Sequence, residues 1–296
     1  MPKILLTGAS GFLGAHLVHR LSQKFHLFST IYHSPIPSGI RHPASVIKLD
    51  ITNYRGVIAS VEKINPDVII HTAANTNLRD CEENPKGAWA LNVEGTKNLA
   101  AKEINARFIY LSTDTVFDGT GQFCKETDTP NPFNVYGKTK LEGENVVTSL
   151  LPNAVTLRLA LLYGWSLTRS TTFTEDLIKE LEQDKPIRAF TDEYRTPLHV
   201  ENLCEIIEEI IEHPTIKGLS HVAGPDRVNR YEQALRIAEI FNLDTSLISP
   251  ITTTEIKSLN YNRPKDCSLN TEKLQSVIKT RIWSLDKGLN VMHETL

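Results

Sequence analysis

KILLTGASGFLG, residues 3–14, opens the chain and decides the fold. Residues 3–7 are an apolar run that predicts a strand, and residues 11–23 have the spacing of an amphipathic helix. Glycines at positions 8, 11 and 14 permit a tight turn and let backbone N–H groups approach a pyrophosphate at the helix N-terminus. The stretch therefore predicts a dinucleotide site, and a plain tight strand–helix connection is the alternative.

Short apolar runs and amphipathic stretches alternate through about the first 163 residues of the chain. They predict strands at 27–31, 45–49, 67–71, 107–112 and 154–160, and helices at 54–63, 85–102 and 134–150. Repeated β-α-β units whose strands are apolar throughout are typical of a parallel sheet with helices on both faces. We therefore expect an α/β fold of the doubly wound Rossmann type.

After about Gly164 the pattern is less regular. Helices are expected at 175–183 and 200–212, and a polar tract at 252–264 precedes a short helical end. We expect a dinucleotide-binding domain at 1–163, with later segments returning to it, and a smaller, mostly helical substrate lobe at 164–296.

Composition limits the class of protein. The 296 residues are 40% hydrophobic with a net charge of −3, which excludes a disordered chain and gives no electrostatic basis for binding nucleic acid or an anionic membrane. No apolar run approaches the roughly 20 residues of a membrane-spanning helix. The four cysteines are scattered and share no metal-binding spacing with histidine, so we expect free thiols, no metal site and a cytoplasmic protein.

Tyr136 and Lys140 lie one helical turn apart in the predicted helix at 134–150, so they share a face. A cation beside the phenol favours phenolate, and we expect it to lower the pKa of Tyr136 toward neutrality and make the residue a general acid or base. The same spacing recurs at Tyr261 and Lys265, where Pro264 argues against a helix. Context therefore selects Tyr136.

STDTVFDG, residues 112–119, follows the strand predicted at 107–112. Open α/β sheets bind ligands at the carboxyl ends of their strands, so a hydroxyl here could hold a substrate carbonyl oxygen beside Tyr136. Since Ser, Thr, Asp and Gly are also turn formers, an ordinary turn is the alternative.

The three motifs, in this order, resemble the extended short-chain dehydrogenase/reductase superfamily. Further matches are Asp50-Ile51, HTAA at 71–74, LNVEGT at 91–96 and PLHVENL at 197–203. Within the superfamily, residues 112–119 and RPKDCSL at 263–269 resemble the dTDP-4-dehydrorhamnose reductase family. Thr115, Thr172 and the bulky Tyr194-Arg195 pair depart from that family's pattern, and these departures fall in the expected substrate pocket.

The resemblance implies that Thr113 is the catalytic hydroxyl, Tyr136 the acid and Lys140 its partner. Together with chain position it gives the expected cofactor contacts, which are Gly8, Ser10, Gly11, Phe12, Leu13, Gly14, His33, Asp50, Ile51, Ala73, Ala74, Asn92, Tyr136 and Lys140. The expected substrate contacts are Asp114, Trp165 and Arg263.

The function implied by the resemblance is NAD(P)H-dependent reduction of a keto-sugar nucleotide. Two alternatives stay open: a non-catalytic, NADP-binding regulatory subunit similar to the β subunit of methionine adenosyltransferase, and a nucleotide-sugar epimerase or dehydratase. Dehydratases usually carry acidic residues beside the catalytic hydroxyl, and Asp114 supplies only one. The expected partner is a small-molecule nucleotide sugar, and the sequence is compatible with a homodimer.

The second strand bears on the choice of cofactor. An NAD-specific site places Asp or Glu at the end of that strand, about 20 residues past the glycines, to bind the ribose 2′-hydroxyl. Here residues 30–34 read TIYHS, and Asp50 is the first acidic residue of the chain. Nothing in this region repels a 2′-phosphate, which His33, Ser34 and Arg41 could meet. We expect NADP(H) to be preferred, with NAD(H) also usable.

Overall fold

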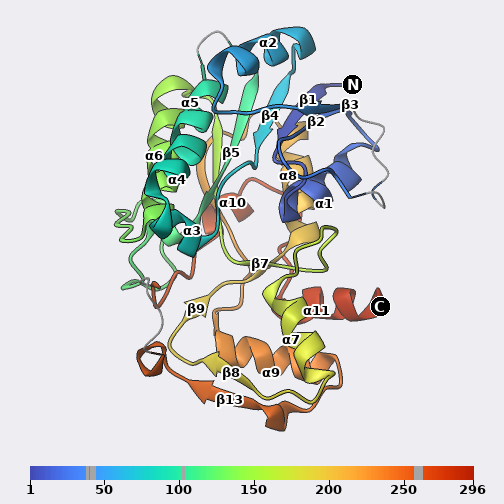
Figure 1. Ribbon diagram of the computed structural model, residues 1–296, viewed down its shortest axis with the longest axis vertical. Coiled ribbons are helices and arrows are strands. Elements are labelled where there is room, and N and C mark those ends of the chain that lie inside the picture. The colour runs from blue at the N-terminus through green and yellow to red at the C-terminus, as the bar shows by residue number, and fades with distance from the viewer. Residues whose placement is uncertain (38–39, 41–44, 102–103, 257–262) are drawn as a thin grey trace.

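The computed structural model describes residues 1–37, 40, 45–101, 104–256 and 263–296. Seven parallel strands form the main sheet in the order β11-β6-β5-β4-β1-β2-β3 (Figure 1). They are β1 (Lys3–Thr7), β2 (His26–Ile31), β3 (Ser45–Lys48), β4 (Val68–His71), β5 (Arg107–Thr113), β6 (Val155–Leu159) and β11 (Gly218–Val222). The doubly wound parallel α/β fold predicted from the sequence is confirmed.

Successive residues of a strand point to opposite sides of the sheet. Because residues on both sides are apolar here, helices cover both faces. Ile4 and Ile70 pack in one core with α1 (Phe12–Leu21) and α8 (Val200–Glu212). Leu5 and Ile69 pack in another core on the opposite face. The helices on that face are α2 (Tyr54–Ile64), α5 (Gly95–Leu99) and α6 (Val135–Leu150). Figure 1 shows these two layers on either side of the strands. Burial on both faces explains why the strands read as unbroken apolar runs.

The last strand of the sheet was not predicted. β11 pairs in parallel with β6, and Ser220 and His221 interrupt its apolar run, so the sequence pattern did not indicate a strand there. The preceding helix, α8, presents its isoleucine stripe to the same core as α1. Residues 200–222 therefore extend the sheet and its helical cover.

The helix predicted at 85–102 is divided. α3 (Leu78–Glu83) precedes α4 (Pro85–Trp89), a π-helical turn η1 (Ala90–Glu94) and α5, which ends at Leu99. A single π turn inside a helix shifts the side chains that follow it and often marks a functional site. Here η1 contains Asn92, which is fully buried.

The rest of the chain forms a second core around α7 (Phe173–Leu181), α9 (Arg230–Ile240) and α11 (Leu285–Glu294). Three short two-stranded ladders accompany these helices, so this part is less helical than expected. The ladders are β7 (Leu162–Tyr163) with β10 (Leu198–His199), β9 (Tyr194–Arg195) with β12 (Val228–Asn229), and β8 (Ile187–Phe190) with β13 (Ile248–Ile251). Further short helices among the described residues are η2 (Asp114–Val116), η3 (Thr245–Leu247), η4 (Thr253–Glu255) and α10 (Glu272–Gln275). Among the described residues, no helix has the length and apolar character needed to cross a lipid bilayer.

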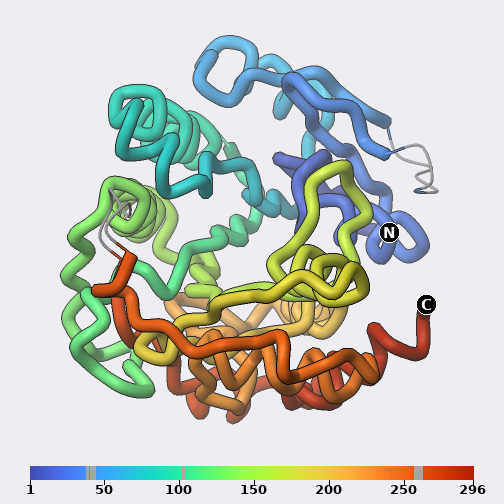
Figure 2. The backbone as a smooth tube through the Cα atoms, turned by 60° about the horizontal axis from the view of Figure 1, so that its bottom comes forward, coloured from blue at the N-terminus to red at the C-terminus, as the bar shows by residue number. Residues whose placement is uncertain are grey.

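The segment at 263–270 connects the two parts of the structure and runs beside the loop at 119–124 (Figure 2). The Cys124 amide donates to the Ser268 carbonyl at 2.9 Å, and the Tyr194 amide donates to the Lys265 carbonyl at 2.6 Å. These backbone contacts bring Arg263 to the carboxyl edge of the main sheet.

Candidate active site

A cleft of about 440 Å³ lies at the carboxyl ends of β1, β4, β5 and β6. It brings together many of the residues that the sequence analysis selected, namely Gly8, Gly11, Phe12, Leu13, Gly14, Ala74, Thr113, Asp114, Tyr136, Lys140 and Arg263. Glu193, Arg195 and Arg230 complete its far end. The glycine turn, the strand-end hydroxyl and the tyrosine–lysine pair therefore share one cavity.

The glycine turn is built for close backbone approach. Gly8 has a φ of +72°, and a Cβ there would lie 2.6 Å from the Ala73 amide nitrogen. A Cβ on Gly14 would lie 2.1 Å from the Gly8 carbonyl oxygen. Gly11 is the N-cap of α1 and its first-turn N–H groups receive no side-chain cap from the described residues. Uncapped N–H groups at a helix N-terminus fit the phosphates of a dinucleotide.

A buried polar chain holds this turn against β4. Thr96 donates to the Asn92 carbonyl at 2.6 Å, so His71 Nε2 donates to Thr96 at 3.0 Å and Nδ1 accepts from the Thr7 hydroxyl at 2.8 Å. Burial lowers the pKa of His71 to about 3, and the imidazole is therefore neutral. His71 has no free ring nitrogen for a ligand, and its contribution is to fix the floor of the cleft.

Several of the expected contacts do not line the cleft: Ser10, His33, Asp50, Ile51, Ala73, Asn92 and Trp165. Asn92 accepts from the Asn75 amide at 2.8 Å and donates to Thr139 at 2.9 Å, so its side chain is engaged within the protein. The Trp165 indole donates to the Met292 carbonyl at 2.8 Å and lies edge-on to Phe241, inside the second core. Trp165 is therefore part of that core and does not reach the sugar side of the cleft.

The expected adenosine-side residues lie apart from the cleft, around the ends of β2 and β3. His33 is exposed, and its ring centroid lies 4.0 Å from that of Tyr32. Asp50 accepts from the Thr52 amide at 2.9 Å and from the Thr52 hydroxyl at 2.7 Å. Ile51 is buried in the core. Arg41 and Tyr261 lie outside the described residues.

Tyr136 lies in the first turn of α6, where the Asn134 side chain accepts from the Gly137 amide and caps the helix. Burial is the largest effect on its phenol and raises the pKa of Tyr136 well above its usual range, although a hydrogen bond with Thr113 opposes the shift. Our expectation that Lys140 would lower this pKa is therefore wrong. Tyr136 is protonated at neutral pH and can act as an acid.

Lys140 explains this outcome. Its side chain is buried, and Nζ lies 4.1 Å from the centroid of the Tyr110 ring. Burial lowers the pKa of Lys140 to about 7, with the Glu144 carboxylate acting in the opposite direction. At neutral pH only about half of the Lys140 amines are therefore protonated. Such a group stabilises a neighbouring phenolate less than a fully charged ammonium would.

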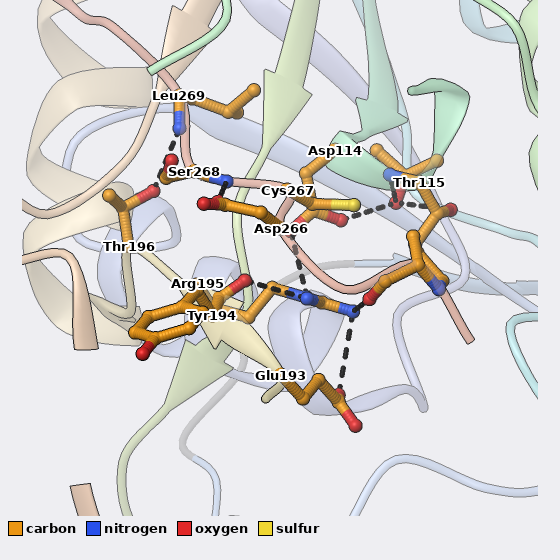
Figure 3. Close-up of polar contacts among 12 residues, drawn as sticks. Asp114, Thr115, Glu193, Tyr194, Arg195, Thr196, Asp266, Cys267, Ser268 and Leu269 are labelled. Carbon is orange, nitrogen blue, oxygen red and sulfur yellow. Dashed lines mark hydrogen bonds and ion pairs between the residues drawn. The ribbon is translucent and has the colours of Figure 1, made fainter. Parts of the chain in front are cut away.

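The far end of the cleft is a cluster of charged side chains that the sequence analysis largely missed. Glu193 is only 1% exposed and lies 2.9 Å from Arg263, 3.4 Å from Arg195 and 3.5 Å from Arg230. Figure 3 shows the Arg195 guanidinium between Glu193 and Asp114, and its Nε lies 3.7 Å from Asp114 Oδ2. Three guanidinium groups against two carboxylates leave this end of the cleft with one net positive charge.

Asp114 connects this cluster to the catalytic side. Thr113 donates to Asp114 Oδ1 at 3.2 Å. Burial raises the pKa of Asp114 to about 6, although the charge of Arg195 lowers it. Glu193 and Arg230 carried no sequence signal, because residues from distant segments meet here only in the folded chain. The bulk of Arg195, where a glycine-containing segment was expected, was the only indication.

Known proteins resemble this chain both in sequence and in fold. A family model described as RmlD substrate binding domain matches residues 2–296. Methionine adenosyltransferase 2 subunit beta of Bos taurus is 32% identical over 284 residues, covering 93% of this chain and 82% of that protein. A probable low-salt glycan biosynthesis reductase of Haloferax volcanii is 33% identical over 248 residues, covering 82% of this chain and 81% of that protein. The dTDP-4-dehydrorhamnose reductase of Bacillus anthracis, in complex with NADP, superposes with a TM-score of 0.87 at 26% identity, over 100% of this chain and 99% of that chain.

Proposed function

Because the chain belongs to the RmlD substrate binding domain family, we propose that it is an NAD(P)H-dependent reductase of a keto-sugar nucleotide. The observation that carries this proposal is the meeting of Thr113, Tyr136 and the glycine turn in one cleft whose other end holds three arginines. A hydride donor, a proton donor and an anion-binding region are then available along one cavity. The four cysteines are free and buried, which agrees with our placement of the protein in the cytoplasm.

The proposed chemistry uses few side chains. A bound nicotinamide supplies the hydride for the carbonyl carbon. Tyr136, protonated at neutral pH, donates its proton to the carbonyl oxygen, while the Thr113 hydroxyl holds that oxygen by a hydrogen bond. Lys140 binds the nicotinamide ribose beside Tyr136. The uncapped N-terminus of α1 binds the pyrophosphate of the cofactor.

The direct test is a screen of dTDP-, UDP-, GDP- and CDP-linked keto-sugars for consumption of NADPH. Turnover of one nucleotide series above the others would identify the base that the protein recognises. If none of them caused NADPH to be consumed, the protein would not be a reductase of these substrates.

Arg263 is our candidate contact for the substrate diphosphate. It lines the cleft, and its guanidinium donates to Glu193 at 2.9 Å, so an anionic ligand would share this arginine with a carboxylate. A charge-assisted contact to phosphate contributes about 1.5–3 kcal/mol. We expect Arg263→Ala to weaken binding of a nucleoside diphosphate about tenfold or more, with NADPH affinity unchanged.

Calorimetry with the four nucleoside diphosphates, in the presence of NADPH, measures this effect. Arg188→Ala, which removes an exposed arginine of β8 in the same part of the chain, is the matched control. Equal nucleotide affinity in the Arg263 and Arg188 variants would mean that Arg263 only pairs with Glu193.

NADPH should bind more tightly than NADH, by about tenfold if one charge-assisted contact meets the 2′-phosphate. His33 is exposed at the end of β2, where this phosphate would lie, and no acidic residue precedes Asp50 in the chain. Fluorescence titration of the protein with each cofactor measures the ratio. Tighter binding of NADH would contradict the argument and would point to Asp50 as a ribose ligand.

A second function is favoured by one comparison. The similarity to methionine adenosyltransferase 2 subunit beta extends over most of both chains, and it suggests a dinucleotide-binding regulatory subunit. Such a protein needs no nucleotide-sugar site. If the protein with NADPH bound no nucleoside diphosphate or nucleotide sugar in calorimetry, and instead co-eluted with a methionine adenosyltransferase catalytic subunit in gel filtration, this function would replace the reductase.

A further inference from the structure

A row of polar side chains crosses the sheet under helix α6. Ser112 on β5 is the register partner of Arg158 on β6, and Arg158 is the register partner of His221 on β11. Residues paired in this way on neighbouring parallel strands point to the same face of the sheet. Apolar side chains occupy most of the sheet interior, so a continuous polar row is a costly feature that calls for an explanation.

Glu144 of α6 closes this row from above. Its carboxylate accepts from Arg158 Nε at 2.9 Å and from Arg158 Nη2 at 2.8 Å, and it also accepts from the Ser112 hydroxyl. The Arg158 and Glu144 side chains are 3% and 7% exposed. The far side of the guanidinium meets His221, whose Nδ1 lies 3.0 Å from the Cys124 carbonyl oxygen. The bidentate ion pair is therefore enclosed, and hydrogen bonds hold it on three strands.

The position of Glu144 relates this row to the candidate catalytic residues. Tyr136, Lys140 and Glu144 follow one another at intervals of one helical turn, so they lie along one face of α6. Ser112, which donates to Glu144, directly precedes Thr113 in the chain. One carboxylate thus contacts the strand that presents the catalytic hydroxyl and lies one turn from the catalytic lysine.

The groups that face Lys140 come from three elements. Tyr136 and Glu144 lie on α6 itself, the Tyr110 ring comes from β5, and neutral His71 comes from β4. Glu144 lies one helical turn from Lys140, and its negative charge favours the ammonium form against the effect of burial. The positive charge of Arg158 balances the negative charge of Glu144. Glu144, Arg158 and a protonated Lys140 therefore have one net positive charge together.

We propose that Glu144 is a positioning residue, which holds α6 in register against Ser112-Thr113 and places a negative charge one helical turn from Lys140. This inference rests on the proposed reductase function, since it assigns a role in that reaction. A purely architectural ion pair would only have to hold the helix in place. The proposed role also requires the negative charge, and this difference can be measured.

The experiment is the pH titration of the Lys140 side chain, followed by NMR in protein labelled with ¹³C at the lysine ε-carbon and assigned with Lys140→Arg. In Glu144→Gln, we expect the midpoint for Lys140 to move to lower pH by about one unit, because loss of a nearby anion favours the neutral amine. The alkaline limb of the pH–rate profile should move in the same direction, with the KM for NADPH unchanged. Glu142→Gln, on the same helix but not in the buried row, should leave both measurements as in the wild type.

Two further variants protect the test from misfolding. Glu144→Gln leaves the buried Arg158 without its anion, so Glu144→Gln/Arg158→Gln removes both charges and should move the Lys140 midpoint in the same direction but by less, because the cation that opposes the ammonium is lost as well. Glu144→Asp keeps the charge and should return the midpoint toward the wild-type value. An unchanged Lys140 midpoint in folded Glu144→Gln would overturn the inference. A wild-type protein without turnover would count against the proposed function, and the titration of Lys140 would still decide whether Glu144 sets its charge.

Discussion

Replacement of Tyr136 by phenylalanine is expected to lower turnover by roughly two to four orders of magnitude, the usual contribution of a positioned general acid. The substitution removes the hydroxyl that bonds to Thr113 and keeps the ring that fills this part of the cleft. NADPH affinity should therefore stay close to the wild-type value. Steady-state consumption of NADPH with the keto-sugar found in the screen gives the first quantity, and fluorescence titration gives the second.

The control is Tyr261→Phe, which alters the second copy of the Tyr-x-x-x-Lys spacing, outside the described residues. That variant should turn over substrate at the wild-type rate. If Tyr136→Phe did the same, Tyr136 would have no part in the reaction, and Asp114 would be the remaining acid beside Thr113.

The ionisation of the site agrees with a reduction. A ketone that receives a hydride also needs a proton, and Tyr136 holds one throughout the neutral range because its pKa is raised. A tyrosine ionised at neutral pH would instead be suited to the oxidation of an alcohol. The spacing of Tyr136 and Lys140 agrees with their position in one cleft, but it contains no information on burial, and burial decides the direction of both pKa shifts.

Features encoded within one short stretch could be predicted from the sequence. The strand–turn–helix at residues 3–14, the helix that carries Tyr136 and Lys140, and the strand that ends at Thr113 all form as expected. The resemblance to dTDP-4-dehydrorhamnose reductases is confirmed by the family match and by structural similarity. In each case local apolar spacing, glycine placement or a motif gave a signal that tertiary packing did not override.

Features that depend on several segments could not be predicted. Glu193 meets Arg195, Arg230 and Arg263 only because β9 pairs with β12 and the 263–270 segment lies against both parts of the structure. Trp165 follows a strand end that points to the cleft, yet its indole turns to Met292 in the second core. Strand β11 was missed because Ser220 and His221 interrupt its apolar run, and His221 belongs to the polar row and not to an apolar core.

Substitution of Gly14 by alanine should weaken NADPH binding by about 100-fold or more, equivalent to about 2.7 kcal/mol. The new methyl group would lie 2.1 Å from the Gly8 carbonyl oxygen and 2.9 Å from Ala9 Cα, so the turn and the first turn of α1 must separate. These neighbours are backbone atoms and cannot rotate away as a side chain could. The N–H groups that bind the pyrophosphate would then lose their common direction.

Helix propensity acts in the opposite direction, which makes this variant informative. Alanine favours a helix over glycine by about 1 kcal/mol, so Gly14→Ala would stabilise α1 if the close approach to Gly8 did not matter. Gly56→Ala in α2 is the matched control, because its methyl group would meet only the Asn53 side chain, at 3.4 Å. We expect that control to bind NADPH as the wild type does and to melt at a slightly higher temperature. If Gly14→Ala behaved like the control in fluorescence titration and thermal melting, the glycine turn could not be the phosphate site. The turn and the first turn of α1 would then have moved apart without any loss of NADPH binding.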